Sequence, residues 1–309
     1  HVTGARALVV TSALAADHPE VARARAIGLP IIRRAEALGE VTSGSGRELV
    51  AIAGTHGKST TTAMTAFALA AAGRDPTALV GARVSQWGGN LRPGGDRLYV
   101  AEADEYDRSF LALSPTVAVV TNVEADHLDV YADLADIRRA FAQFVRGARS
   151  VVVCADDLGA TALAMPATSE VVRYGVQSAD ARLVARDQRP TADGSAFVVE
   201  FDGERLGSVA LRVPGAHNVL NALAALGAGI VLGAPFADLV RGIADFSGTE
   251  RRFELHGAVT HDLEGLAPAG SREDFAGLTD TYTDRTHGYV YTAAVDYGVP
   301  LVTNIHAAA

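Results

Sequence analysis

The sequence predicts an α/β fold built on a central, mostly parallel sheet, and three observations support this prediction. Short apolar runs alternate with helix-like segments along the first half of the chain, as in a parallel sheet wrapped by helices. The apolar run 49–53 enters a glycine-containing turn and leaves it through an alanine-rich, helix-like segment. Between residues 181 and 213, period-two runs separated by Asp-Gly pairs predict hairpins and therefore a small antiparallel element.

Residues 1–45 predict a partial, Rossmann-like α/β domain. Its expected elements are strands 7–11 and 30–33 and helices 18–26 and 35–38. The chain opens almost directly on its first strand, so we expect this domain to be the back half of a larger one. A Ser- and Gly-rich segment, 42–46, reads as the linker that ends it.

Residues 46–250 predict the central domain, and residues 251–309 a remnant or diverged C-terminal segment without clear periodicity. The expected central elements are strands 49–53, 75–84, 98–101, 117–121 and 150–154, and helices 58–72, 137–145 and 216–232. A glycine-rich loop is expected after the strand that ends at residue 84.

Composition limits the classes of partner. Of the 309 residues, 49% are hydrophobic and 20% are charged, so the chain can bury a core. A net charge of −9 argues against a nucleic-acid partner. The apolar stretch 219–236 contains Asn221 and glycines, which favours a buried helix over a membrane span. Cys154 is the only cysteine, so no internal disulfide is possible, and we expect a cytoplasmic protein with this thiol buried in a strand. The oligomeric state is left open.

The turn Gly54-Thr55-His56-Gly57 followed by Lys58 and Ser59 has the layout of a phosphate cradle. Backbone N–H groups and the positive end of a helix would face the anion, Lys58 would add a charge, and Ser59 would reach a magnesium ion. The strict Walker pattern requires a glycine where Ile52 stands, which disfavours a generic P-loop NTPase. The alternative is a helix N-terminus with an incidental lysine.

Two predicted strands run into polar residues that suit a metal. Glu102, Asp104, Glu105 and Asp107 follow one strand, and Asn122, Glu124, Asp126, His127 and Asp129 follow another. In an open α/β sheet, ligands bind beyond the carboxyl ends of the strands. Magnesium takes few protein carboxylates and completes its shell with water and phosphate oxygens. We therefore expect Glu102 and His127 close together beside Lys58. The alternatives are a solvated acidic loop and a structural histidine.

Four ordered motifs together resemble the Mur ligases. They are Gly54-Thr55-His56-Gly57-Lys58-Ser59-Thr60, Glu102-Ala103-Asp104-Glu105, the run from Thr121 to Asp129, and His217-Asn218-Val219-Leu220-Asn221-Ala222. The resemblance covers about residues 1–257 and is closest to the members that add L-alanine to UDP-N-acetylmuramate. It implies a central ATPase domain of the P-loop type and an ATP-dependent amide ligase of peptidoglycan synthesis. ATP and Mg²⁺ would be its cofactors, and UDP-N-acetylmuramate and L-alanine its substrates.

The resemblance also implies roles for individual residues. Lys58, Glu102 and His127 would be catalytic, with Ser59 and Glu102 on one magnesium and His127 on a second. The residues implied to bind the nucleotide are Gly54, Thr55, His56, Gly57, Lys58, Ser59, Thr60, Asn218, Asn221, Arg251 and Arg252. Asn218 and Asn221 would lie on the adenine side.

Both ends of the sequence depart from the family pattern. The glycine-rich UDP-binding start is not found before His1, and residues 258–309 do not match the third domain. We therefore expect Mg-ATP binding with little or no ligation by these 309 residues. The alternatives are another Mur-type ligase, such as a muropeptide-recycling or folylpolyglutamate synthetase-like enzyme, and a non-catalytic nucleotide-binding fragment.

Overall fold

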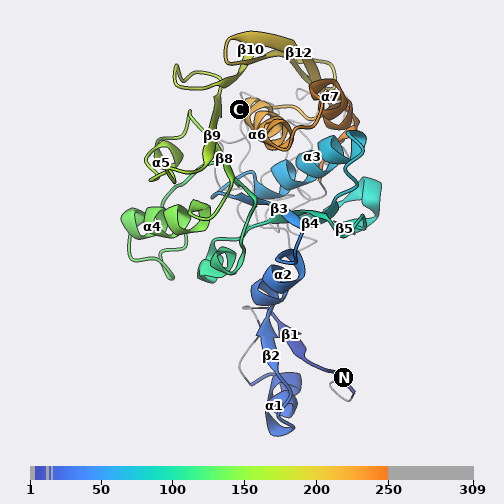
Figure 1. Cartoon of the computed structure of the whole chain (residues 1–309), viewed down its shortest axis with the longest axis vertical. Helices are drawn as coiled ribbons and strands as arrows, with labels where there is room; N and C mark the ends of the chain where they lie inside the picture. Colours follow the sequence, from blue (N-terminus) through green and yellow to red (C-terminus); the bar gives the residue numbers. More distant parts are fainter. Residues whose placement is uncertain (1–3, 12–13, 15–16, 250–309) are drawn as a thin grey trace, which may run out of the picture. The chain divides into compact units, whose positions relative to one another are not determined.

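The computed structural model describes residues 4–11, 14 and 17–249 (Figure 1). The predicted C-terminal segment 251–309, with Arg251 and Arg252, lies outside the described residues. Among the described helices, none has the length and apolar character needed to cross a membrane.

A small parallel pair of strands begins the described chain. It consists of β1 (Leu8–Val10) and β2 (Ile31–Arg33), which are joined by helix α1 (Pro19–Ala26). Helix α2 (Arg34–Thr42) follows directly and is longer than the predicted helix 35–38. Glu36 stabilises its start, because the carboxylate accepts a hydrogen bond of 2.9 Å from the Arg33 N–H.

A ten-stranded sheet forms the centre of the described residues, with the order β12-β11-β10-β9-β8-β7-β3-β6-β4-β5. Its strands are β3 (Glu48–Ala53), β4 (Thr77–Val84), β5 (Gly89–Arg92), β6 (Leu98–Glu102), β7 (Val117–Val120), β8 (Ser150–Cys154), β9 (Glu170–Gly175), β10 (Leu183–Thr191), β11 (Gly194–Phe201) and β12 (Glu204–Leu211). All neighbours from β10 through β4 pair in parallel, whereas β5, β11 and β12 pair antiparallel. The predicted α/β class, including its antiparallel element, is confirmed.

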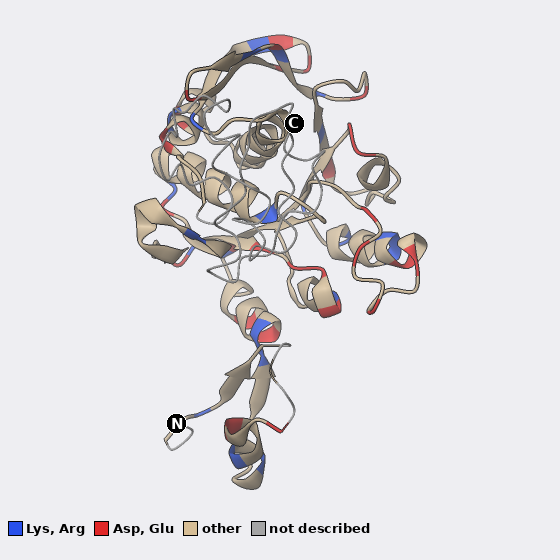
Figure 2. Ribbon diagram, turned by 180° about the vertical axis from the view of Figure 1, so that it is seen from behind, with Lys and Arg blue, Asp and Glu red and all other residues tan. Residues whose placement is uncertain are grey.

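Helices cover both faces of this sheet. They are α3 (Lys58–Ala71), α4 (Leu134–Val145), α5 (Leu158–Thr161), α6 (Ala216–Val231) and α7 (Phe236–Asp245), with the 3₁₀ turns η1 (Ser85–Trp87) and η2 (Tyr106–Ala112). Helices α3, α6 and α7 pack on one face, and α4 and η2 on the other. In Figure 2, α6 carries no charged residue along its length, as expected for a helix that packs between other elements.

Strand β3 shows why the sheet must be covered on both sides. Val50 and Ile52 face the core under α3 and α6, while Leu49, Ala51 and Ala53 face the core under α4. All five side chains are at most 1% exposed. An apolar run without polar alternation is typical of a strand buried on both faces of a parallel sheet.

Among the described α-helices and strands, β5, β9, α5 and α7 were not predicted, and neither were the 3₁₀ turns η1 and η2. Strand β5 lies in the glycine-rich loop expected after residue 84, and its pairing with β4 is a tertiary contact that local composition does not show. Helix α7 presents Leu239 and Ile243 to the core and follows Pro235, which ends the apolar stretch that α6 begins.

The order of the strands indicates where a ligand is expected to bind. Strand β3 lies between β6 and β7, so the chain leaves β3 toward one side of the sheet and later crosses to the other. In open α/β sheets, ligands bind outside the carboxyl ends of the strands at such a reversal. A ligand site is therefore expected at the loops that follow β3, β6 and β7.

Candidate functional site

The turn between β3 and α3 requires glycine at two positions. Gly54 and Gly57 have φ values of 143° and 83°, which side chains rarely adopt. A Cβ on Gly57 would stand 2.6 Å from Asn221 Oδ1, and one on Gly54 would collide with the Thr121 hydroxyl. The turn opens helix α3, whose first-turn N–H groups have no partner within the helix. The predicted strand–turn–helix layout is therefore present, and its binding of phosphate stays a prediction.

The cradle is attached to the loop after β7. The N–H groups of Thr55 and His56 donate to the carbonyl and side-chain oxygens of Asn122, at 3.1 and 2.8 Å. The Thr121 hydroxyl donates to the His56 carbonyl at 2.6 Å. These contacts fix the turn from outside and leave the start of α3 to face an anion. The predicted nucleotide contacts of Gly54, Thr55, His56 and Thr60 stay predictions.

Lys58 forms an ion pair with Glu105 at the mouth of the cradle. Its Nζ lies 2.8 Å from both carboxylate oxygens and donates to the Gly54 carbonyl at 2.7 Å. The two side chains are only 14% and 3% exposed. Burial raises the pKa of the Glu105 carboxyl, and the charge of Lys58 acts in the opposite direction as the weaker influence. Lys58 is therefore held in one place by a buried acid.

Glu105 was named among the acidic residues after this strand, but its pairing with Lys58 was not predicted. It belongs to the same acidic run as Glu102, but the run offered no periodic signal to tell which carboxylate is buried. Lys58 is the sequence feature that could have predicted a buried carboxylate, because a buried cation requires a carboxylate nearby.

Glu102 contacts Ser59, the residue that follows Lys58 in the first turn of α3. The Ser59 hydroxyl donates to its Oε1 at 3.1 Å, and the Gly81 N–H donates to its Oε2 at 2.6 Å. Magnesium usually takes only one or two ligands from the protein, and one hydroxyl oxygen and one carboxylate beside a phosphate cradle match that number. No group of three or more His, Cys, Asp or Glu side chains suited to a metal occurs within the described residues. A cation that takes most of its ligands from water and phosphate therefore fits this donor pair.

His127 reaches the site from the loop after β7. Its Nε2 lies 3.8 Å from Glu105 Oε1, the same oxygen that accepts from Lys58. The ring packs edge-on against Tyr106, with centroids 5.1 Å apart, and the backbone adopts φ 52°. Glu105 thus lies close to both His127 and Lys58. Glu102 instead contacts Ser59, the residue after Lys58 in α3. The roles predicted for these residues stay predictions.

Asn218 and Asn221 project from the start of α6. They are 1% and 7% exposed, and the Asn221 amide donates to Asn218 Oδ1 at 3.1 Å. Asn221 Oδ1 accepts from the Thr61 hydroxyl at 3.2 Å, which ties α6 to α3. Both amides therefore have protein partners, and their contact with adenine stays a prediction.

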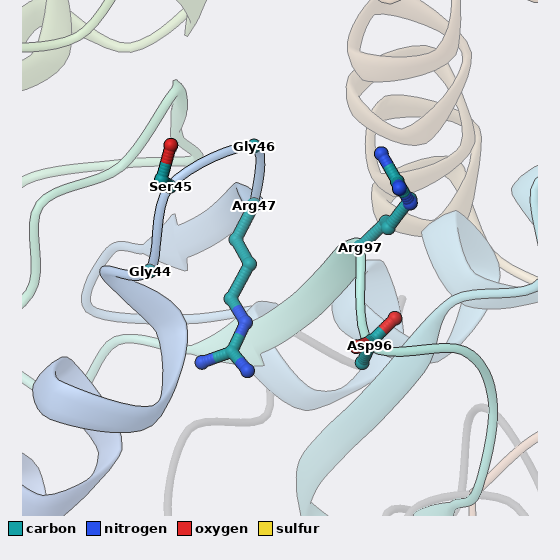
Figure 3. Close-up of a pocket in the computed structure, with 6 residues that line it drawn as sticks. All are labelled: Gly44, Ser45, Gly46, Arg47, Asp96 and Arg97. Atoms are coloured by element: carbon teal, nitrogen blue, oxygen red, sulfur yellow. The ribbon is translucent and has the colours of Figure 1, made fainter.

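A separate polar pocket lies at the opposite edge of the sheet (Figure 3). It has a volume of about 280 Å³ and is lined by Gly44, Ser45, Gly46, Arg47, Asp96 and Arg97. These residues precede β3 and β6, so the pocket is at the amino ends of the strands, about 20 Å from the cradle by strand length. It takes no part in the site described above.

The site and fold match known families. Residues 52–229 match the Mur ligase middle domain, and residues 1–45 match the Mur ligase family, catalytic domain. The UDP-N-acetylmuramate–L-alanine ligase of Acidothermus cellulolyticus is 47% identical over 266 residues, which cover 84% of this chain and 55% of that protein. The chain thus spans about half the length of this curated relative.

Solved structures agree. The UDP-N-acetylmuramate–alanine ligase of Thermotoga maritima superposes with a TM-score of 0.71 at 32% identity, over 83% of this chain and 57% of that one. A UDP-N-acetylmuramate:L-alanyl-γ-D-glutamyl-meso-diaminopimelate ligase from Neisseria meningitides gives a TM-score of 0.67 at 26% identity, over 81% and 82%.

Proposed function

Since the chain belongs to the Mur ligase family, we propose that residues 46–249 supply the ATP-binding part of a ligase that joins L-alanine to UDP-N-acetylmuramate. Among the solved structures, the identity is 32% to the L-alanine ligase against 26% to the muropeptide ligase, and the curated relative with 47% identity is also an L-alanine ligase, which favours L-alanine as the amine. The free, buried Cys154 is consistent with a cytoplasmic location.

Two polar pairs at the first turn of α3 are the main support for the proposal. Lys58 is paired with Glu105, and Ser59 with Glu102. Phosphoryl transfer requires chiefly that groups be positioned and that charge be neutralised around the phosphate oxygens. A cradle that has both a cation and a magnesium-type donor pair beside it meets both requirements.

The described residues suggest a division of tasks. The N–H groups at the start of α3 would hold the phosphates, and Lys58 would neutralise the oxygens of the transferred group. Ser59 and Glu102 would hold Mg²⁺, which supplies positive charge to the phosphate oxygens when bound. Glu105 keeps the Lys58 ammonium at the mouth of the cradle before the nucleotide arrives. His127, whose Nε2 lies 3.8 Å from Glu105, would bind a second Mg²⁺.

The overall reaction forms an amide at the expense of ATP. The carboxylate of UDP-N-acetylmuramate would attack the γ-phosphorus and release ADP. The amine of L-alanine would then attack the resulting acyl phosphate, lose a proton and expel inorganic phosphate. Holding the reactants in line contributes about 7–11 kcal/mol toward such a barrier. The cradle positions only the phosphoryl donor, so the positions of both other substrates lie outside this proposal.

The test is a titration of the chain with Mg-ATP by calorimetry, followed by an assay of phosphate release and product. Three substrate pairs are compared: UDP-N-acetylmuramate with L-alanine, UDP-N-acetylmuramate with a recycled tripeptide, and a folate with glutamate. We expect magnesium-dependent ATP binding, and any product only with the first pair. Absence of ATP binding would refute the proposed site, and product from another pair would refute the proposed substrate.

A further inference from the structure

Tyr131 connects the backbones of two loops that meet at the site. Its hydroxyl donates to the carbonyl oxygen of Glu105 at 2.6 Å. Its own backbone N–H donates to the carbonyl oxygen of His127 at 3.0 Å. One side chain that is 1% exposed therefore links the loop after β6 to the loop after β7. These loops come from strands on opposite sides of β3, so a direct contact between them is a tertiary one.

The phenol ring is itself held in place. The Arg108 guanidinium lies over the ring, 4.8 Å from its centroid, and pairs with Asp136 at 2.6 Å. Asp136 also accepts from the Ala132 N–H at 3.2 Å, one residue beyond Tyr131. A cation over an aromatic face and a charge-assisted hydrogen bond both restrict the ring.

The loop that Tyr131 restrains is conformationally unusual. Asp107 and Arg108 are consecutive non-glycine residues with φ of 54° and 55°. Such backbone costs about 1–3 kcal/mol per residue and persists only where its surroundings enforce it. The Glu105 carbonyl accepts hydrogen bonds from both the Tyr131 hydroxyl and the Arg108 N–H. These two contacts hold the backbone in this conformation.

We propose that Tyr131 is a positioning residue that fixes the separation of Glu105 and His127, and through Glu105 the place of Lys58. This inference rests on the proposed function, because it assigns a purpose to that separation. Burial raises the pKa of Tyr131 to about 12, so the hydroxyl remains a donor throughout the physiological range. A misplacement of about 1 Å at a reacting centre can cost up to about 100-fold in rate.

The test compares Tyr131→Phe with Tyr174→Phe. Tyr174 is equally buried in β9, outside the loops of the site, so the pair separates a local effect from loss of a buried hydroxyl. Hydrogen exchange by NMR reports on the amides of Arg108 and Tyr131, which donate to Glu105 and His127. We expect these amides to exchange at least about tenfold faster in Tyr131→Phe, relative to global opening, and to be unchanged in Tyr174→Phe.

The same variants are assayed for Mg-ATP affinity by calorimetry. We expect Tyr131→Phe to weaken the affinity about tenfold, because Lys58 loses its fixed place through Glu105, while Tyr174→Phe leaves the affinity unchanged. Unchanged exchange at Arg108 and Tyr131, or faster exchange with unaltered affinity, would overturn the proposal. If the unmodified chain binds no Mg-ATP, the proposed function fails separately, and the exchange experiment still decides whether Tyr131 fixes the two loops.

Discussion

The two edges of the central sheet carry the same kinds of charged residue in different surroundings. At the amino edge, Glu48 pairs with Arg74 and Arg149, each at 3.0 Å, and the three side chains are 27%, 34% and 58% exposed. At the carboxyl edge, Lys58 and Glu105 are 14% and 3% exposed. The charged residues at the amino edge thus have the exposure of an ordinary protein surface, whereas those at the carboxyl edge are buried as in a binding site.

Burial accounts for the difference. A partly exposed ion pair contributes about 0–1 kcal/mol, because water screens the charges and competes for them. A buried pair has lost its hydration, so each charge depends on the other, and removing one partner costs about 3–5 kcal/mol. The carboxyl edge also has a helix N-terminus and two strand-end loops, which the amino edge lacks. The same sheet can therefore present a structural edge and a functional one.

The largest effect is expected from Lys58→Ala. The substitution removes the cation at the cradle, so we expect the affinity for Mg-ATP to fall at least about 100-fold, or about 2.8 kcal/mol. It also removes the lysine partner of the buried Glu105, at a cost of about 3 kcal/mol in the free energy of unfolding, toward the lower end because Lys58 keeps some exposure. Calorimetry and urea unfolding measure the two effects.

The double variant Lys58→Ala with Glu105→Gln separates binding from folding. A neutral amide needs no cation, so we expect most of the lost stability to return while the affinity for Mg-ATP stays low. Recovery of binding in the double variant would mean that Lys58 serves only to neutralise Glu105.

The pH dependence of the free energy of unfolding tests whether Glu105 is buried beside Lys58. Because the pKa of Glu105 is raised from its ordinary value of 4.5, the folded chain binds this proton more tightly than the unfolded chain. That contribution is complete below about pH 4.5 and is lost as the pH rises through the raised pKa. Lys58→Ala removes the charge that limits the rise, so its stability should fall further with increasing pH than that of the double variant. Parallel pH profiles would contradict the burial argument.

A smaller effect is expected at the amino edge. Glu48→Gln breaks two partly exposed ion pairs worth about 0–1 kcal/mol each, so we expect a loss of at most about 2 kcal/mol in the free energy of unfolding. The affinity for Mg-ATP should be unchanged, because Glu48 lies at the far end of β3. This variant is the matched control for Lys58→Ala, and an effect on binding would erase the distinction between the edges.

The smallest effect is expected at Cys154, at the carboxyl end of β8. Burial raises the pKa of its thiol to about 11, so almost no thiolate forms at pH 8. We expect no labelling of the folded chain by a thiol reagent at pH 8 and complete labelling in urea. Rapid labelling without denaturant would show that this part of the sheet opens readily.

The sequence predicted the elements that local pattern controls. The strands around β3 and the helix after Gly57 were predicted because apolar runs and glycine turns act over a few residues. Of the two acidic residues beside the cradle, the sequence predicted the place of Glu102 better than that of Glu105. Glu102 ends its strand at a predictable edge, whereas the burial of Glu105 depends on Lys58, which is 47 residues away. The role inferred for Tyr131 depends on a hydroxyl and an amide that reach two loops at once, and no local pattern encodes such a contact.

A structure with a non-hydrolysable ATP analogue and Mg²⁺ tests the central claim most directly, because it compares the two edges in one experiment. We predict the triphosphate on the first turn of α3, Lys58 turned from Glu105 toward the phosphates, and the metal at Ser59 and Glu102. Nucleotide bound in the pocket between Arg47 and Arg97, or at the carboxyl edge without contact to Lys58, would contradict this account.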